Sequence, residues 1–167
     1  MNAHAKQSSF DKNATILTQH LMRDVKEIFS TMVGLDDLLH LPIQIDPITH
    51  FSDCVSALVG MAGSFNGLVC LHMPSELAAM ATSNMLGMTV REVNEDVHDA
   101  MGEIANMIAG SFKQHLSTSG LDVRLSTPSV VTGKEYIVTP HNNPNQIAVR
   151  FATDYDWFMV AVAFESD

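Results

Sequence analysis

The stretch Asp99-Ala-Met-Gly102-Glu103-Ile-Ala-Asn106-Met-Ile-Ala-Gly110 carries the clearest structural pattern in this sequence. Asp99, Glu103, Asn106 and Gly110 are spaced i, i+4, i+7 and i+11, so in an α-helix they form one polar stripe. A second stripe on another face is apolar and consists of Met101, Ile104, Ala105, Ile108 and Phe112. The sequence therefore predicts an amphipathic helix, here called the motif helix, that displays a carboxylate and an amide one turn apart.

Asn106 is an unusual residue for the middle of a helix. Asparagine is mildly unfavourable there, and its amide has no acid or base chemistry near neutral pH, so what it offers is a fixed hydrogen-bond geometry. The carboxylate of Glu103 lies one turn away on the same stripe. The ordinary alternative is that both residues belong to a solvated helix face, where such side chains are usually found.

Periodicity predicts two further helices before the motif helix. Apolar residues recur at helical spacing from Leu17 to Met32, and Gly34 stands where that helix would end. Pro74 begins the second helix, since proline is tolerated in a first turn, and Gly87 lies near its end. The motif helix then runs from about residue 93 to residue 117. At 1.5 Å per residue it would be nearly 40 Å long, roughly enough to cross a whole sheet.

The remaining segments have the apolar patterns and turn signals of strands. They are 54–61 and 65–73, joined by a hairpin across 62–64, and then 123–131, 136–139, 147–153 and 157–164. Elements of these types in this order predict an α+β fold in which long helices pack on one face of a mainly antiparallel sheet.

A faint internal repeat relates the first helix to the motif helix. Sliding one over the other places Glu27 on Glu103, Ser30 on Asn106 and Gly34 on Gly110, whereas Arg23 falls on Asp99. Any two amphipathic helices can be slid to match at three positions, which is the plain alternative. We interpret the halves as pseudo-symmetric, and the first copy as a structural relic, because it lacks the amide and has arginine in place of the acid.

Composition limits the domain organisation and the partners. A chain of 167 residues, 46% of them hydrophobic, is long enough for one well-buried core, so we expect a flexible leader at 1–13 and a single domain at 14–167. The formal charge of −10 has no compensating basic run, which disfavours binding to nucleic acid or to an anionic membrane surface.

Two further observations concern the cellular compartment. No stretch approaches 18 uninterrupted apolar residues and the N-terminus lacks a cationic start followed by an apolar run, so we expect a soluble, cytoplasmic protein. Cys54 and Cys70 lie in apolar segments without a C-x2-C partner, which indicates buried free thiols.

The spacing Asp99-x3-Glu103-x2-Asn106, followed by Gly110 and later by Pro128, resembles the signature of the CheC/CheX/FliY family of bacterial chemotaxis phosphatases. The resemblance covers roughly residues 14–165, and the single good copy of the motif is most similar to the CheX-like members. It implies a CheC/CheX-like fold. The activity it implies is that of a hydrolase that removes phosphate from the aspartyl phosphate of a CheY-like response regulator and so adapts chemotaxis signalling.

The same resemblance implies a role for each motif residue. Glu103 and Asn106 would be catalytic, with Asn106 placing a water in line with phosphorus and Glu103 pairing with a lysine of the regulator. Asp99, Gly102 and Gly110 would contact the partner. Pro128 would shape the turn that supports the motif helix. The family also implies a homodimer that pairs through its sheets, no cofactor of its own, and Mg²⁺ on the response-regulator partner.

Two alternative functions stay open at this point. The first is a noncatalytic CheX-like module that binds a response regulator or a flagellar switch protein. The second is a metal-dependent hydrolase that uses Asp99 and Glu103, which would need further convergent ligands. The eight histidines are dispersed and form neither H-x3-H nor H-E-x2-H, so no metal site is predicted.

Overall fold

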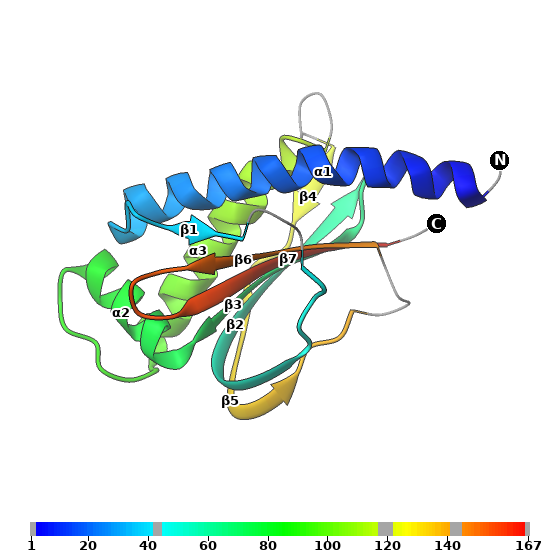
Figure 1. Cartoon of the computed structure of the whole chain (residues 1–167). Helices are drawn as coiled ribbons and strands as arrows, with labels where there is room; N and C mark the ends of the chain where they lie inside the picture. The colour runs from blue at the N-terminus through cyan, green and yellow to red at the C-terminus, as the bar shows by residue number, and fades with distance from the viewer. Residues whose placement is uncertain (1–2, 42–44, 117–121, 141–144, 166–167) are drawn as a thin grey trace.

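The computed structural model describes residues 3–41, 45–116, 122–140 and 145–165, with side chains from residue 13 onward in these ranges. Helices and strands follow one another as shown in Figure 1. In chain order they are α1 (Ala3–Ile28), the π-helical segment η1 (Phe29–Val33), β1 (Leu39–His40), β2 (His50–Gly63), β3 (Gly67–Pro74), α2 (Ser75–Leu86), α3 (Glu95–Lys113), β4 (Val123–Leu125), β5 (Ser129–Ile137), β6 (Asn145–Ala152) and β7 (Trp157–Phe164).

The strands form one sheet in which each pairing is antiparallel. The strand order is β1-β6-β7-β3-β2-β4, and β5 pairs with β2 on the same side as β4. The order is symmetric about the β7–β3 pair. The two halves correspond strand by strand: β2 matches β6, β3 matches β7, and β1 matches β4 with β5. Exchanging the matched strands gives the same order read backwards, as pseudo-symmetric halves require.

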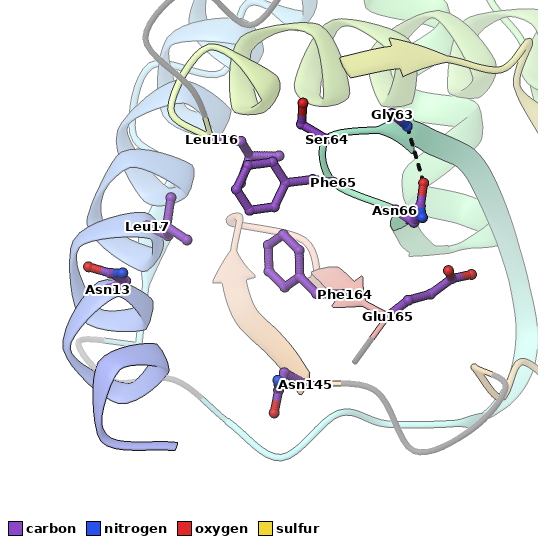
Figure 2. A pocket seen from close by; sticks show the side chains of 10 residues that line it. All are labelled: Asn13, Leu17, Gly63, Ser64, Phe65, Asn66, Leu116, Asn145, Phe164 and Glu165. Carbon is purple, nitrogen blue, oxygen red and sulfur yellow. Dashed lines mark hydrogen bonds between the residues drawn. The ribbon is translucent and has the colours of Figure 1, made fainter. Parts of the chain in front are cut away.

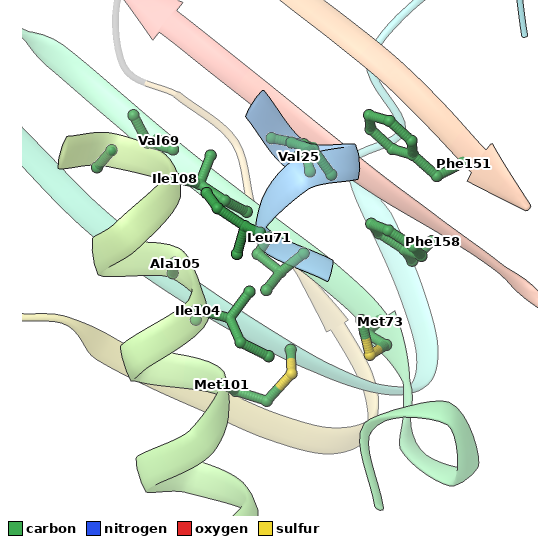
Figure 3. Close-up of a cluster of buried hydrophobic side chains, with 14 of the residues drawn as sticks. Val25, Val69, Leu71, Met73, Met101, Ile104, Ala105, Ile108, Phe151 and Phe158 are labelled. Carbon is green, nitrogen blue, oxygen red and sulfur yellow. The ribbon is translucent and has the colours of Figure 1, made fainter. Parts of the chain in front are cut away.

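The helices cover one face of this sheet and share a single large core with it. Alternate strand residues such as Leu71 and Phe151 point toward the helices, and they meet Val25 of α1 and Ile104 and Ile108 of α3 (Figure 3). Each of these five side chains is at most 1% exposed. Because burying one such side chain contributes about 1.5–3 kcal/mol, the core fixes α3 firmly on the sheet. The predicted α+β architecture is confirmed.

Glycine ends two of the helical segments, as the sequence predicts. Gly34 follows η1 with a φ of 70°, and its N–H bonds to the carbonyl of Phe29. Gly87 follows α2 with a φ of 65°. Both values lie in the left-handed region, which glycine occupies without steric cost.

The strands that follow α3 differ from the prediction. Segments 123–131 and 136–139 were expected as two strands, whereas the structure has β4 and then one continuous β5. The break lies at residues 126–128, because Pro128 has no N–H to offer to a ladder. Gly133 pairs with Cys54, so β2 holds β5 extended through a stretch whose sequence suggests a turn.

The N-terminal segment is helical from residue 3 onward. Helix α1 begins at Ala3 and so includes most of the segment 1–13 that we expected as a flexible leader. Alanine, lysine and glutamine near this end are good helix formers, so extending α1 backwards is favourable. The division into a leader and one domain stays a prediction. No helix in the described ranges has the length and apolar character needed to cross a membrane.

The sheet face away from the helices carries a smaller apolar cluster around Phe51, Cys70 and Met159. A polar network lies beside it. The Oγ of Ser56 lies 2.6 Å from Nδ1 of His72 and 2.7 Å from the hydroxyl of Tyr136. This network therefore connects β2, β3 and β5.

Candidate functional site

The predicted motif helix is α3, and its first turn is well defined. Asn94 is the N-cap, and its side-chain oxygen accepts a hydrogen bond of 3.1 Å from the backbone N–H of Val97. Glu95 and Asp96 lie in the first turn, where carboxylates interact favourably with the helix dipole. The helix ends at Lys113, four residues before the predicted end.

The two faces of α3 are divided as the sequence predicts. The buried residues include Met101, Ile104, Ala105, Ile108 and Phe112, which is the predicted apolar stripe. Asp99, Glu103 and Asn106 are exposed. Within the described part of the chain, these three side chains form no hydrogen bond or ion pair with a neighbour. A rigid, core-backed helix thus presents free polar groups to solvent.

Glu103 and Asn106 lie three residues apart on this surface, so their Cβ atoms are separated by about 5–6 Å. The pair offers an acceptor carboxylate beside a group that both donates and accepts hydrogen bonds. Neither side chain has to break a hydrogen bond within the described part of the chain before it binds another molecule. The arrangement suits the recognition of a cation next to a positioned water.

Gly102 does not lie on this exposed surface. It is buried, and a Cβ atom at this position would lie 3.4 Å from Cβ of Pro128 and 3.8 Å from a methyl group of Val130. The expectation that Gly102 contacts a partner therefore does not fit its position, since β5 and the turn before it cover the residue. Its lack of a side chain lets α3 approach Pro128 closely.

The β4–β5 break positions Pro128 for this contact. Ser126 bonds to Gly60 of β2 twice: its N–H donates to the Gly60 carbonyl and its Oγ accepts from the Gly60 N–H, both at 2.9 Å. These two hydrogen bonds hold the turn between β4 and β5 against β2, at the point where the strand pairing is interrupted. Pro128 is thus placed against the middle of the motif helix, in line with its predicted supporting role. The Ser126-Thr-Pro128 run is a turn signal from which the break was predictable.

Gly110 has the opposite environment. It is half-buried at the far end of the polar stripe, and a Cβ atom there would meet nothing within 4 Å. Packing inside the chain therefore does not require glycine at this position. Glycine in a helix interior costs about 0.5–1 kcal/mol relative to alanine, so the open space above Gly110 remains as room for an approaching surface.

The metal-dependent alternative finds no support in the structure. Among the residues described, no group of three or more His, Cys, Asp and Glu side chains is placed to hold a metal ion. His98 is half-buried next to Asp99 in the sequence, yet it belongs to a different part of the helix surface.

Comparison with known proteins adds to this picture. The family model described as chemotaxis phosphatase CheX matches residues 55–152, which is more than half of the chain and includes all of α3. The chain belongs to the CheX family. The resemblance inferred from Asp99, Glu103 and Asn106 is therefore confirmed at the level of the family.

Individual relatives agree with this assignment. The CheY-P phosphatase CheX of Thermotoga maritima is 27% identical over 116 residues, which cover 69% of this chain and 74% of that protein. The structure of the chemotaxis protein CheX from Vibrio vulnificus is 29% identical, covers 89% of this chain and 96% of its own, and has a TM-score of 0.75. A CheX-CheY-BeF3-Mg²⁺ complex from Borrelia burgdorferi shows the same fold, with 19% identity, coverage of 89% and 97%, and a TM-score of 0.76.

The CheX-family motif is separate from the cavity drawn in Figure 2. That cavity, of about 380 Å³, lies between α1, the β2–β3 turn and the ends of β6 and β7. Leu17, Phe65, Leu116 and Phe164 provide its apolar lining. None of Asp99, Gly102, Glu103, Asn106 and Gly110 lines it. The exposed stripe of α3, rather than a hollow, is the candidate site.

Proposed function

We propose that this protein is a phosphatase that hydrolyses the aspartyl phosphate of a CheY-like response regulator and thereby adapts chemotaxis signalling. The observation that carries the proposal is the free, exposed pair Glu103 and Asn106 on a helix fixed by the core. Membership of the CheX family and the CheY-P phosphatase activity in the name of the Thermotoga relative support it.

Asn106 supplies the catalytic contact in this mechanism. Its side-chain oxygen accepts a hydrogen bond from a water and holds that water in line with phosphorus. The water oxygen bonds to phosphorus as the bond from phosphorus to the aspartyl oxygen breaks, which releases inorganic phosphate and the regulator's carboxylate. An acyl phosphate is already labile, so positioning alone gives a large acceleration. No covalent intermediate on this chain is needed.

Glu103 supplies the docking contact. Its carboxylate pairs with a lysine of the regulator's active site, and this pairing also determines where Asn106 reaches. The complex from Borrelia burgdorferi contains Mg²⁺ together with CheY and BeF3. We therefore assign the Mg²⁺ of the reaction to the regulator, with no cofactor held by this chain.

The ends of the stripe complete the interface. Asp99 is exposed one turn before Glu103 and is proposed to orient the regulator by its charge. Gly110 gives the regulator room to approach, because its position is open. In this scheme Gly102 does not contact the regulator and instead lets α3 pack closely against Pro128.

We also propose that the protein pairs as a homodimer through its sheet. Ile48 and Trp157 are large apolar residues that are 42% and 38% exposed, and both line a hollow on the sheet face away from the helices. Sedimentation of the full chain at several concentrations tests this state. A monomer at every concentration would remove the proposal without affecting the catalytic one.

The decisive experiment follows the decay of a phosphorylated receiver with and without this protein. The Asn106→Ala variant should lose about 10²–10³ in rate, which is the usual cost of one preorganised transition-state contact. Its affinity for the same receiver bound to beryllofluoride should stay close to that of the wild type. Gln19→Ala, which removes an exposed amide from α1, is the matched control and should retain full activity.

Two outcomes would contradict the proposal. Wild-type turnover by a folded Asn106→Ala protein would remove the mechanism. Tight binding to the receiver without any acceleration of its decay would instead favour the noncatalytic binding module.

A further inference from the structure

A closed ring of four side chains joins α1 to the end of α3. Nε2 of His115, just beyond α3, lies 2.7 Å from Oδ2 of Asp24. The His115 ring stacks on His20, with centroids 4.1 Å apart and an angle of 6° between the planes. Arg23 closes the ring, because its guanidinium lies 3.0 Å from Nδ1 of His20 and 3.6 Å from Oδ1 of Asp24.

The direction of each hydrogen bond follows from the chemistry of the groups. A guanidinium can only donate, so Nδ1 of His20 is the acceptor and His20 is neutral. Burial lowers the pKa of His20, and the nearby His115 and Arg23 lower it further, while Asp24 opposes them. Nε2–H of His115 donates to the Asp24 carboxylate. Each of the two histidines thus has a defined protonated nitrogen.

The contact between Asp24 and His115 is largely shielded from water. Their side chains are only 11% and 19% exposed, whereas that of Arg23 is 62% exposed. Hydrogen bonds to charged groups contribute more than neutral ones, and they are stronger away from solvent. Asp24 and His115 are therefore the part of the ring that fixes geometry, and Arg23 forms its solvent side.

The ring lies at the C-terminal end of α3, where Phe112 also packs on Phe164 of β7 with ring centroids 6.0 Å apart. Pro128 supports the middle of α3 at Gly102, and beyond that point Lys113 reaches the carbonyl of Val123 at 3.3 Å. His115 follows Asn106 by nine residues and lies just beyond the last residue of α3, Lys113. A small tilt or rotation of α3 at this end moves Asn106 relative to a docked surface. A misplacement of about 1 Å can lower a rate by up to about 100-fold.

We propose that Asp24 and His115 are positioning residues for the phosphatase reaction, which clamp the motif helix to α1 so that Asn106 stays aligned with the attacked phosphorus. This inference rests on the proposed function. Arg23, at the position that matches Asp99 in the internal repeat, belongs to the same clamp. The helix that lacks a site of its own thus supports the helix that has one.

The test measures kcat and KM for a phosphorylated receiver with full-length variants. Asp24→Ala should lower kcat about fivefold to tenfold while KM changes less than about twofold, because alignment is more sensitive than docking to a small rotation. Asp24→Asn should restore most of kcat, since its amide oxygen can accept the same bond from His115. His115→Ala should reproduce the loss, and the Asp24→Ala/His115→Ala double variant should be no worse than either single variant.

Glu27→Gln is the matched control, because Glu27 is an exposed carboxylate one turn further along α1. Thermal unfolding is recorded for every variant, and kinetics are measured well below the lowest midpoint. A lower midpoint with wild-type kcat would show that the clamp only stabilises the fold and would overturn the proposal, as would a change in KM alone. If Asn106→Ala is also fully active, the proposed function itself fails. If Asn106→Ala is inactive and Asp24→Ala keeps the kcat of the wild type, only the clamp fails.

Discussion

His72 gives the structure a specific dependence of stability on pH. The side chain is 5% exposed, its Nδ1 lies 2.6 Å from Oγ of Ser56, and Phe51 stacks on its ring at 4.0 Å. Burial lowers the pKa of His72 from 6.5 to about 4. The folded protein therefore keeps this imidazole neutral at pH values where the unfolded chain binds a proton.

The sign and size follow from proton linkage. Between pH 6.5 and pH 4 the unfolded state binds more protons at this site than the folded state, so the free energy of unfolding falls as the pH falls. Above about pH 6.5 the imidazole is neutral in both states, so burying His72 costs no stability through protonation there. Each pKa unit corresponds to about 1.4 kcal/mol, so lowering the pH from 7 to 4.5 should cost roughly 2 to 3 kcal/mol at His72. That is a large share of the total of about 5–15 kcal/mol for a typical domain.

Urea unfolding at pH 7, 6, 5 and 4.5 measures this effect, with His72→Gln as the test variant. Glutamine can bond to Ser56 but does not titrate, so the wild type should lose roughly 2 to 3 kcal/mol more than the variant over this range. His50→Gln, which replaces an exposed histidine of β2, is the matched control. Parallel losses in the wild type and His72→Gln would refute the reasoning, whatever the stability of the variant at pH 7.

Three further predictions concern the motif and its relic. Glu103→Ala should weaken receiver binding by about 1.5–3 kcal/mol and slow turnover, and Glu103→Lys should be worse because it sets lysine against lysine; titration calorimetry checks both. Gly110→Ala should raise the free energy of unfolding by about 0.5–1 kcal/mol, because a Cβ atom there meets nothing within 4 Å. The same variant should bind the receiver more weakly, and an unchanged affinity would contradict a close approach of the receiver at this position. Ser30→Ala should change turnover by less than about twofold, and the Asn106→Ala protein should show no residual second-site activity.

The motif helix was predictable because several local signals agree. Its apolar residues repeat at helical spacing, and the structure buries the predicted apolar stripe. The start at Glu95 rather than residue 93 follows from capping by Asn94, a preference that is also visible in the sequence. The predicted end at residue 117 was too late, because periodicity alone does not define where a last turn opens.

The contacts between residues far apart in the sequence were not predictable in this way. Asp24 and His115 are 91 residues apart, and Ser56 and Tyr136 are 80 apart, so each contact exists only once the sheet and helices have assembled. A lone histidine in a sequence does not reveal whether it stacks on another ring or lies under a strand. Gly102 is a similar case. The sequence places it on α3, but its contact with Pro128 depends on the break between β4 and β5.

The two halves of the fold are alike in their strands and different in their helices. The strand order is unchanged by exchanging the halves, and this exchange pairs α1 and η1 with α3. On α3 a regular helix brings Glu103 and Asn106 together on the exposed face.

In the first half the position that matches Asn106 is Ser30, which lies in the π-helical turn and donates a hydrogen bond to Asp36. A π turn rotates the residues that follow it relative to an α-helix, so this segment cannot repeat the spacing of the polar stripe. The hydroxyl of Ser30 is also committed within the chain, whereas the amide of Asn106 is free. Geometry and side-chain chemistry thus both support the proposal that α3 alone carries a site.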